Sequence, residues 1–262
     1  MVTQKQIETF TQQAYLRNAA VFADSQVISD GIGERVQSIL QPEIWANAVA
    51  NCPLSGDETA KVEVFLQEMK AKKINLGWQL WPDTAPEIIE VLEGKMPSGE
   101  TWECVYAKSE AIVKSVPVKH RITLLDESTV VGYVGAQRKA WGNSAAVAPL
   151  LLGIAKLRLV DKQQTILICQ NSAGEILGAA AALHKDDWAY LKGDFVIPSH
   201  RRQGIHRCLI AARNKHLDSL GVRHQVALTD QNTSASLYVK LGFQSTHRVK
   251  FRTLRNSEWV SL

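Results

Sequence analysis

The stretch between residues 189 and 221 constrains the fold most, because it changes from a strand to a helix through a short basic turn. Residues 189–197 have the composition of a strand, and Pro198, which cannot donate to a sheet ladder, ends it. From Ile205 the apolar residues recur at helical spacing, and Gly221 stands where a left-handed helix cap belongs. We therefore expect a strand that passes through a glycine turn, residues 201–206, into a helix N-terminus.

This turn has the chemistry of an anion-binding site. A helix N-terminus presents unpaired N–H groups and the positive end of the helix dipole, which favour a phosphate or pyrophosphate, and Gly204 admits it closely. Between Phe195 and Leu217 there are no acidic residues and five basic ones: Arg201, Arg202, Arg207, Arg213 and Lys215. Neither the Gly-Lys-Ser/Thr ending of a nucleotide loop nor the three-glycine dinucleotide fingerprint is present, so another phosphate-bearing ligand is expected.

Two motifs in and after this turn resemble those of the GNAT superfamily of acyl-CoA-dependent N-acetyltransferases. The family signature is Gln/Arg-x-x-Gly-x-Gly/Ala after a strand that ends in proline, and this chain has Arg201-x-x-Gly204-x-His206. The downstream half of the pattern follows as Asn232-x-x-Ala235 and Leu237-Tyr238-x-x-Leu241-Gly242-Phe243. His206 departs from the family, which has a small residue there, and it either narrows the loop or donates a hydrogen bond to phosphate.

The resemblance implies an α/β fold of the α+β type, in which helices flank a central, mostly antiparallel mixed sheet. It also implies acetyl-CoA as cosubstrate, with its pantetheine arm paired to strand residues Phe195, Val196 and Ile197. The pyrophosphate would be bound by the loop, and Asn232 would contact the cosubstrate at the head of the second helix. The implied loop residues are Arg201, Arg202, Gln203, Gly204, Ile205 and His206.

Acetyl transfer to an amine requires two proton movements. A lysine-type amine, with a pKa of about 10.4, is almost entirely protonated at neutral pH, so a base must take its proton before attack. The leaving thiolate benefits from protonation, and the resemblance assigns that proton to Tyr238. Asp194, beside the pantetheine-pairing segment, is the candidate base. The alternatives are ordered water and the histidines at 184, 200 and 224.

Simpler roles and other functions stay open. Tyr238 also fits a core aromatic, and Asn232 also fits a helix N-cap. His206 in a small-residue position favours a catalytically weak acyl-CoA-binding regulatory module as the alternative function. A nucleic-acid binder would interleave aromatic and basic side chains, and Phe251 is the only good instance, so nucleic acid is disfavoured.

The chain, with 262 residues of which 45% are hydrophobic, is long enough for one large or two modest domains. Its first domain, residues 1–115, is expected to hold helices over 6–22, 59–71 and 87–93 and strands over 74–81 and 101–107. This half shows a weak repeat of the second half: a helix, Leu92-Glu93-Gly94 and a strand follow each other here, and a helix, Leu241-Gly242-Phe243 and a strand follow each other later. The repeat favours a degenerate GNAT-like domain, as in tandem GNAT proteins. The alternative is an unrelated helical cap. A linker from Ser109 to Val118 leads to the GNAT acetyltransferase domain, residues 118–262.

The second domain has the element order of the resembled fold before its central strand. We expect a strand over 120–125, helices over 128–141 and 145–159, and a hairpin of strands over 165–169 and 176–183. After the glycine turn, strands are expected over 225–229 and 247–254.

The composition of the chain limits the expected cellular location and the expected binding partners. No apolar leader is visible, and the longest nearly apolar run, residues 145–155, is too short to cross a bilayer, so a cytoplasmic protein without membrane contact is expected. The four cysteines form no Cys-x-x-Cys pair, which argues against a disulfide framework and a zinc site, so no metal is expected. The acceptor is expected to be a small-molecule or peptide amine, and the oligomeric state stays open.

Overall fold

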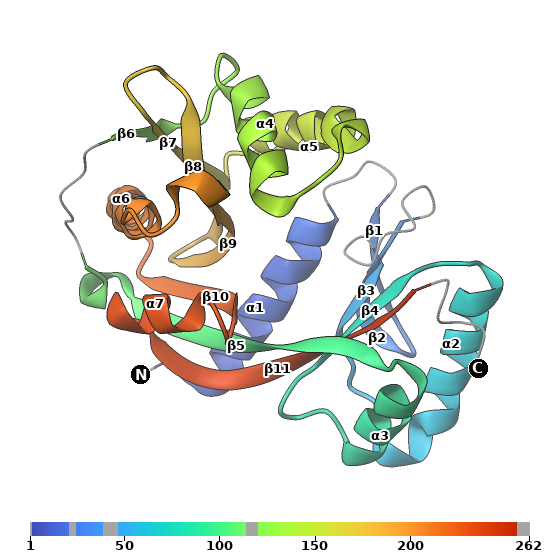
Figure 1. Cartoon of the computed structure of the whole chain (residues 1–262). Helices are drawn as coiled ribbons and strands as arrows, with labels where there is room; N and C mark the ends of the chain where they lie inside the picture. Colours follow the sequence, from blue (N-terminus) through green and yellow to red (C-terminus); the bar gives the residue numbers. More distant parts are fainter. Residues whose placement is uncertain (1, 21–24, 39–46, 114–119, 256–262) are drawn as a thin grey trace. The chain divides into compact units, whose positions relative to one another are not determined.

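The computed structural model describes residues 2–20, 25–38, 47–113 and 120–255, which belong to two compact units (Figure 1). Unit 1 comprises Met1–Cys104, Thr229–Gln231 and Thr246–Leu262, and unit 2 comprises Val105–Leu228 and Asn232–Ser245. Half of the linker expected over Ser109–Val118, residues 114–118, lies outside the described residues. No helix of the described residues is long and apolar enough to cross a membrane.

The sheet of unit 2 is mixed and mostly antiparallel, as expected. The strands follow the spatial order β10-β9-β8-β7-β6, in which β6 to β9 pair antiparallel and β10 pairs parallel with β9. Their bounds are β6 Arg121–Leu124, β7 Gln164–Gln170, β8 Ile176–Lys185, β9 Trp188–Val196 and β10 His224–Asp230.

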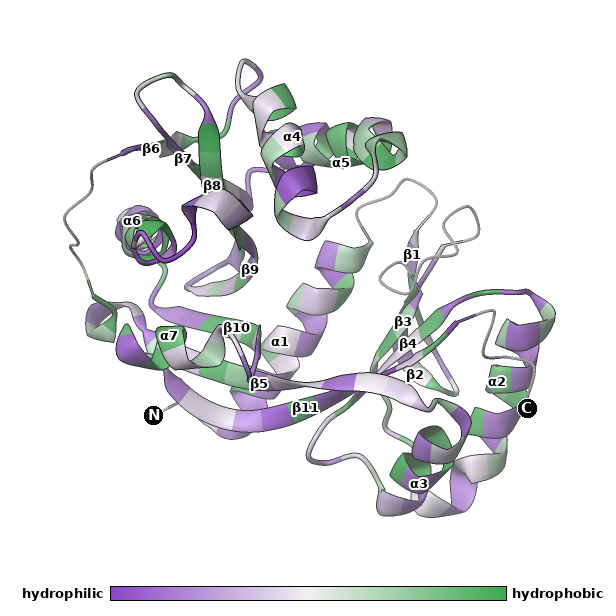
Figure 2. Cartoon of the chain, in the orientation of Figure 1, coloured by the Kyte–Doolittle hydropathy of each residue, from purple (hydrophilic) through white to green (hydrophobic). Residues whose placement is uncertain are grey.

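Helices cover both faces of this sheet because its central strands are apolar on both sides (Figures 1 and 2). Ile166 and Ile168 of β7 pack in one cluster with α4 and α5, whereas the alternating Leu167 and Cys169 pack against α6 through Leu209. The helices are α4 Val130–Trp141, α5 Ala148–Val160, α6 Ile205–Ser219 and α7 Ala235–Lys240. Because alternate residues of a strand face opposite sides of the sheet, α4 and α5 cover one face of the sheet and α6 covers the other.

A bulge in β9 changes which side chains face α6. Ala179 pairs with Phe195 but Ala181 pairs with Lys192, so β9 carries one extra residue, and Gly193 there has φ +63°. Leu191, before the bulge, packs in a cluster with residues of α6. In a regular strand Phe195, four residues later, would face the same side, but it packs in a cluster with residues of α4. The bulge therefore turns residue 194 toward the α6 face.

The first residue of the expected linker is firmly anchored within unit 2. Ser109 begins a short 3₁₀ turn, Ser109–Ala111, and is buried. Its hydroxyl donates to the carbonyl of Val222 and accepts from the Gln225 amide, and its carbonyl accepts from Asn214. Ser109 is therefore part of the folded structure of unit 2.

Unit 1 has its own run of paired strands and its own core. The strands follow the order β1-β2-β3-β4-β11, with β3 parallel to β4 and the other neighbours antiparallel. Trp78 and Leu92 lie at the centre of its apolar core. The elements are α1 Gln4–Ala19, β1 Gln26–Asp30, β2 Gly33–Gln37, β3 Ala48–Asn51, α2 Thr59–Ala71, β4 Leu76–Leu80, α3 Pro86–Lys95, and most of β5 Ser98–Lys108 and β11 Gln244–Leu254. The remaining residues of β5 and β11 belong to unit 2.

The strands β1, β2 and β3 add to the elements expected from the sequence. With them, unit 1 repeats the order of unit 2. In unit 1, three antiparallel strands precede α2, then β4 parallel to the third strand, then α3 and β5. In unit 2, β7, β8 and β9 precede α6, then β10 parallel to β9, then α7 and β11. α3 also runs through Gly94 to Lys95 instead of ending at the glycine.

Candidate active site

The turn between β9 and α6 presents an uncapped helix N-terminus. A 3₁₀ turn, Pro198–His200, follows β9, and α6 begins at Ile205 with Gly204 as its N-cap at φ +79°. No side chain caps this end, and its first turn has no acidic residue. A Cβ added at Gly204 would meet nothing within 4 Å. The helix N-terminus therefore faces open space, as an anion site requires.

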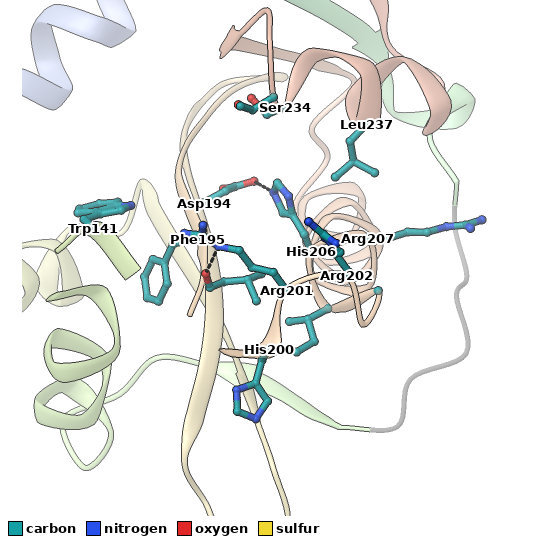
Figure 3. A pocket seen from close by; sticks show the side chains of 14 residues that line it. Trp141, Asp194, Phe195, His200, Arg201, Arg202, His206, Arg207, Ser234 and Leu237 are labelled. Carbon is teal, nitrogen blue, oxygen red and sulfur yellow. Dashed lines mark hydrogen bonds and ion pairs between the residues drawn. The ribbon is translucent and has the colours of Figure 1, made fainter. Parts of the chain in front are cut away.

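A cavity of about 630 Å³ lies in front of this helix end (Figure 3). It is bounded by β9, the turn, the start of α6, the approach to α7 and the last residue of α4. The lining residues are Trp141, Asp194, Phe195, Val196, His200, Arg201, Arg202, Gly204, Ile205, His206, Arg207, Thr233, Ser234 and Leu237. Arg202 and Arg207 add positive charge beside the helix end, which favours an anionic ligand.

Arg201 holds the turn in place. Its Nε donates to the carbonyl of Val196 at 3.2 Å, and its Nη2 donates to the carbonyl of Ala140 at 3.3 Å. Ala140 belongs to the last turn of α4, so the guanidinium joins the end of β9 to the end of that helix. Arg201 thus has a positioning contact in addition to its place on the cavity wall.

One edge of β9 parts from its neighbour beside the cavity. The parallel pairing of β9 with β10 runs from Trp188 to Leu191, although β9 continues to Val196. On the other edge, β9 stays paired with β8, and the N–H of Ile197 still donates to the carbonyl of Leu177 at 2.9 Å. The backbone of Phe195 and Val196 therefore offers an edge to which an extended ligand can pair.

The bulge places Asp194 in a buried network with Arg213. The carboxylate accepts a hydrogen bond from Arg213 Nη1, which also donates to the carbonyl of Ala181 at 2.8 Å. The N–H of Ala181 donates to Asp194 Oδ1 at 3.3 Å. Both backbone groups of Ala181, opposite the bulge, are satisfied by this ion pair.

The ion pair keeps both groups charged. Burial alone would raise the pKa of Asp194, but the guanidinium of Arg213 and the His206 ring outweigh it and lower that pKa to about 2. Burial would lower the pKa of Arg213, and the Asp194 carboxylate raises it instead. The Arg213 side chain is 0% exposed and that of Asp194 10%.

Tyr238 belongs to the same network. Its hydroxyl donates to Asp194 Oδ2 at 2.8 Å and accepts from Arg213 Nη2 at 3.1 Å. The residue is 4% exposed, and its ring packs edge-on against Phe243 at 5.0 Å. Burial, with the nearby Asp194 carboxylate, raises the pKa of the phenol.

His206 turns its ring toward Asp194 (Figure 3). Its Nε2 lies 3.1 Å from Asp194 Oδ2, and its ring meets that of Tyr238 edge-on at 6.2 Å. The side chain thus bonds the carboxylate at the strand bulge, while its backbone lies in the first turn of α6. The ring still lines the cavity.

A family model described as an acetyltransferase (GNAT) domain matches residues 154–253. These residues are a GNAT acetyltransferase domain. The match contains the turn, α6, Asp194 and Tyr238, so the resemblance inferred from the two motifs is confirmed. No match was found among curated proteins.

Solved structures resemble the chain over most of its length. A GCN5-related N-acetyltransferase from Kribbella flavida is 13% identical with a TM-score of 0.68, covering 93% of this chain and 94% of that one. A functionally unknown conserved protein from Staphylococcus epidermidis is 14% identical with a TM-score of 0.69, covering 90% and 96%. A tandem GNAT protein from the clavulanic acid biosynthesis pathway is 12% identical with a TM-score of 0.63, covering 95% of each chain. At these identities the likeness shows the GNAT fold.

Most of the site residues expected in the GNAT domain line the cavity, and four are placed elsewhere. Ile197, Gln203, Asn232 and Tyr238 are not among the described residues that line it. Asn232 precedes the lining residues Thr233 and Ser234, and Ser234, not Asn232, is the N-cap of α7.

Sequence reasoning missed part of the cavity wall and the partner of Asp194. Trp141 is brought in by the end of α4, where no motif marks it, and its ring meets Phe195 edge-on at 5.9 Å. Arg213 was noticed only as one of several basic residues of the helix. Its place two and a half helical turns after Gly204 and the absence of acidic side chains one turn away on α6 give no hint of a carboxylate partner on another element.

Proposed function

We propose that this chain is an N-acetyltransferase that moves an acetyl group from acetyl-CoA directly to a primary amine of a small-molecule or peptide acceptor. The observation that carries the proposal is the uncapped N-terminus of α6, which opens on a basic cavity beside the free edge of a bulged strand. The helix N-terminus can bind a pyrophosphate, and the free strand edge can pair with an extended pantetheine arm. The GNAT domain assignment supports acyl transfer in general.

The residues present fit acetyl-CoA. The N–H groups from Arg202 to His206 would bind the pyrophosphate, with Gly204 leaving the approach open. Arg201 would hold the turn in shape through its bonds to Val196 and Ala140. Asn232 remains a proposed contact near the head of α7.

The pantetheine arm would pair with the free edge of Phe195, Val196 and Ile197. This edge lies directly after the bulge at Gly193, so the thioester end of the arm would come close to Asp194. When bound, acetyl-CoA supplies the activated acetyl group, and the chain orients it and moves the protons.

For Tyr238 we propose the proton donation to the leaving thiolate. Support comes from its place in the downstream family pattern and from its hydroxyl, which has a proton to give and an acceptor 2.8 Å away in Asp194. Donation requires the sulfur to replace Asp194 as that acceptor. Because the pKa of the phenol is raised, the transfer is favourable only once negative charge has developed on sulfur.

For Asp194 we propose an orienting role within the catalytic group. A carboxylate with a pKa of about 2 is a poor proton acceptor at neutral pH. It holds Tyr238, Arg213 and His206 in one network through its two oxygens. The charge is thus used to position neighbouring side chains.

We also propose that residues 1–115 are a degenerate GNAT-like domain and that the acetyltransferase domain spans residues 118–262. The repeated element order of unit 1 supports the first point. Its α2 corresponds to α6, but the turn before it is closed: Ser55 and Glu58 form a capping box, and the Glu87 carboxylate fills the space beside Gly56. These acidic groups would repel a pyrophosphate.

A thiol-release assay with acetyl-CoA and a panel of primary amines, small molecules and lysine peptides, tests the proposal. We expect release of free CoA that depends on one class of amine, with the acetylated amine detected by mass spectrometry. Tight binding of acetyl-CoA by calorimetry without turnover of any amine would instead favour a catalytically weak acyl-CoA-binding regulatory module.

A further inference from the structure

His206 combines two features that no cofactor-binding role explains. Its ring lies against Asp194 at the bulge, with Nε2 3.1 Å from Oδ2, and not over the turn where phosphate would sit. Its side chain is 24% exposed and lines the cavity, while Asp194 behind it is nearly buried. The ring therefore lies between a fixed negative charge and the open cavity.

This arrangement prepares an imidazole for proton transfer. A carboxylate that accepts a hydrogen bond from one ring nitrogen fixes the tautomer, and the other nitrogen is then left with a lone pair for a substrate. Among the described residues, no hydrogen bond to His206 Nδ1 is found. The ring of Tyr238 on α7 meets the His206 ring, and the cationic side chains of Arg201, Arg202 and Arg207 also line the cavity.

Asp194 is itself fixed, which makes the orientation of the ring rigid. Arg213 and the N–H of Ala181 bond Oδ1, and Tyr238 bonds Oδ2 together with His206. A carboxylate held at both oxygens cannot turn away from the imidazole. Among the histidines of the described residues, His206 alone both lines the cavity and bonds a carboxylate of this kind.

We propose that His206 is the general base that takes the proton from the acceptor's ammonium group, an inference that rests on the proposed N-acetyltransferase function. The neutral ring accepts that proton at Nδ1, directly or through one water. The freed amine nitrogen then forms the new C–N bond to the acetyl carbon as the C–S bond breaks and its electron pair leaves on sulfur. A second proton passes from nitrogen to sulfur through Tyr238, and the proton on His206 goes to water.

The test compares His206→Ala with wild type under conditions in which chemistry limits the rate. We expect the amine-dependent rate of CoA release to fall about 10²-fold or more, as for loss of a general base. Added imidazole should restore part of that rate. The dissociation constant of acetyl-CoA, measured by calorimetry, should change less than about threefold, because the backbone N–H groups of the turn remain.

A control on the same helix is His216→Ala, whose side chain lies outside this cavity and should leave the rate unchanged. A second readout needs no turnover: diethyl pyrocarbonate should modify His206 in the free protein, as mapped by mass spectrometry, and CoA should protect it.

Three outcomes would overturn the inference. The first is an amine-dependent rate of CoA release that is the same in His206→Ala and wild type. The second is a His206→Ala variant that loses acetyl-CoA affinity but keeps the wild-type rate at saturating acetyl-CoA. The third is a His206 ring that diethyl pyrocarbonate does not modify in the free protein. Failure of the proposed function would look different, since the wild-type protein itself would then release no CoA with any amine.

Discussion

Asp194→Asn should destabilise unit 2, because it removes the negative charge that accompanies a fully buried guanidinium. The Arg213 side chain is 0% exposed, and its Nη1 bonds Asp194. Breaking a buried ion pair by removing one partner costs about 3–5 kcal/mol. The pKa of Asp194 gives a second figure: lowering an ordinary value of 3.8 to about 2 corresponds to about 2 kcal/mol. Since Asn keeps the size and an acceptor oxygen, we expect a loss of about 3 kcal/mol.

Urea unfolding followed by tryptophan fluorescence measures this loss as a lower midpoint at unchanged slope. Asp194→Leu combined with Arg213→Met removes both charges, and it should be less destabilising than Asp194→Asn alone. A change in unfolding free energy below about 0.5 kcal/mol for Asp194→Asn would show that water or another group neutralises Arg213, and the account of the network would be wrong.

Three further predictions concern the same site. Tyr238→Phe should leave acetyl-CoA affinity nearly unchanged while turnover falls about 10²-fold, at a stability cost of about 1–3 kcal/mol because Asp194 and Arg213 each lose a buried hydrogen bond, whereas Tyr238→Ala should cost about 3 kcal/mol or more in denaturant unfolding; equal turnover of Tyr238→Phe and wild type would leave Tyr238 a structural role only. Gly204→Glu should weaken acetyl-CoA binding more than 10-fold in calorimetry, since it adds a like charge at the anion site and a side chain at φ +79°, and affinity retained within threefold would contradict the role of the turn. Because the pKa of Asp194 is lowered, its stabilising contribution is fully present above about pH 4 and lost as the pH falls through about 2, so the difference in unfolding free energy between wild type and Asp194→Asn should shrink over that range, and a constant difference would refute the sign.

The sequence predicted the part of the fold in which local signals are strong. Pro198, Gly204 and Gly221 mark a strand end, a turn and a helix end, and the structure has β9, the turn and α6 in those places. Proline and glycine change which backbone conformations their own segment can adopt, so the turns and helix ends that they favour depend little on tertiary contacts.

The strands of unit 1 lacked such signals. β1 is exposed on both faces, so it has no apolar alternation to detect, and β3 has only four residues. The pair Asp30-Gly31 between β1 and β2 was the one local hint of a hairpin. Their pairing is set by tertiary context, which a single sequence does not display.

The network around Asp194 was also beyond sequence reasoning, because it depends on contacts between distant elements. Arg213 lies on α6 and Tyr238 on α7, and only the bulge at Gly193 turns Asp194 toward both. The side-chain direction of His206 followed from the same geometry. A glycine within a strand was the available hint of a bulge, but it does not say which side chain is redirected.

Calorimetric comparison of acetyl-CoA with S-acetylpantetheine tests the central claim, that the turn at residues 201–206 binds the pyrophosphate of acetyl-CoA. The two ligands share the thioester and the arm, and S-acetylpantetheine lacks the pyrophosphate together with the adenosine 3′-phosphate attached to it. Two charge-assisted hydrogen bonds to backbone N–H groups at about 1.5 kcal/mol each predict a dissociation constant at least about 100-fold lower for acetyl-CoA. Equal affinity for the two ligands, or no binding of acetyl-CoA, would contradict the account.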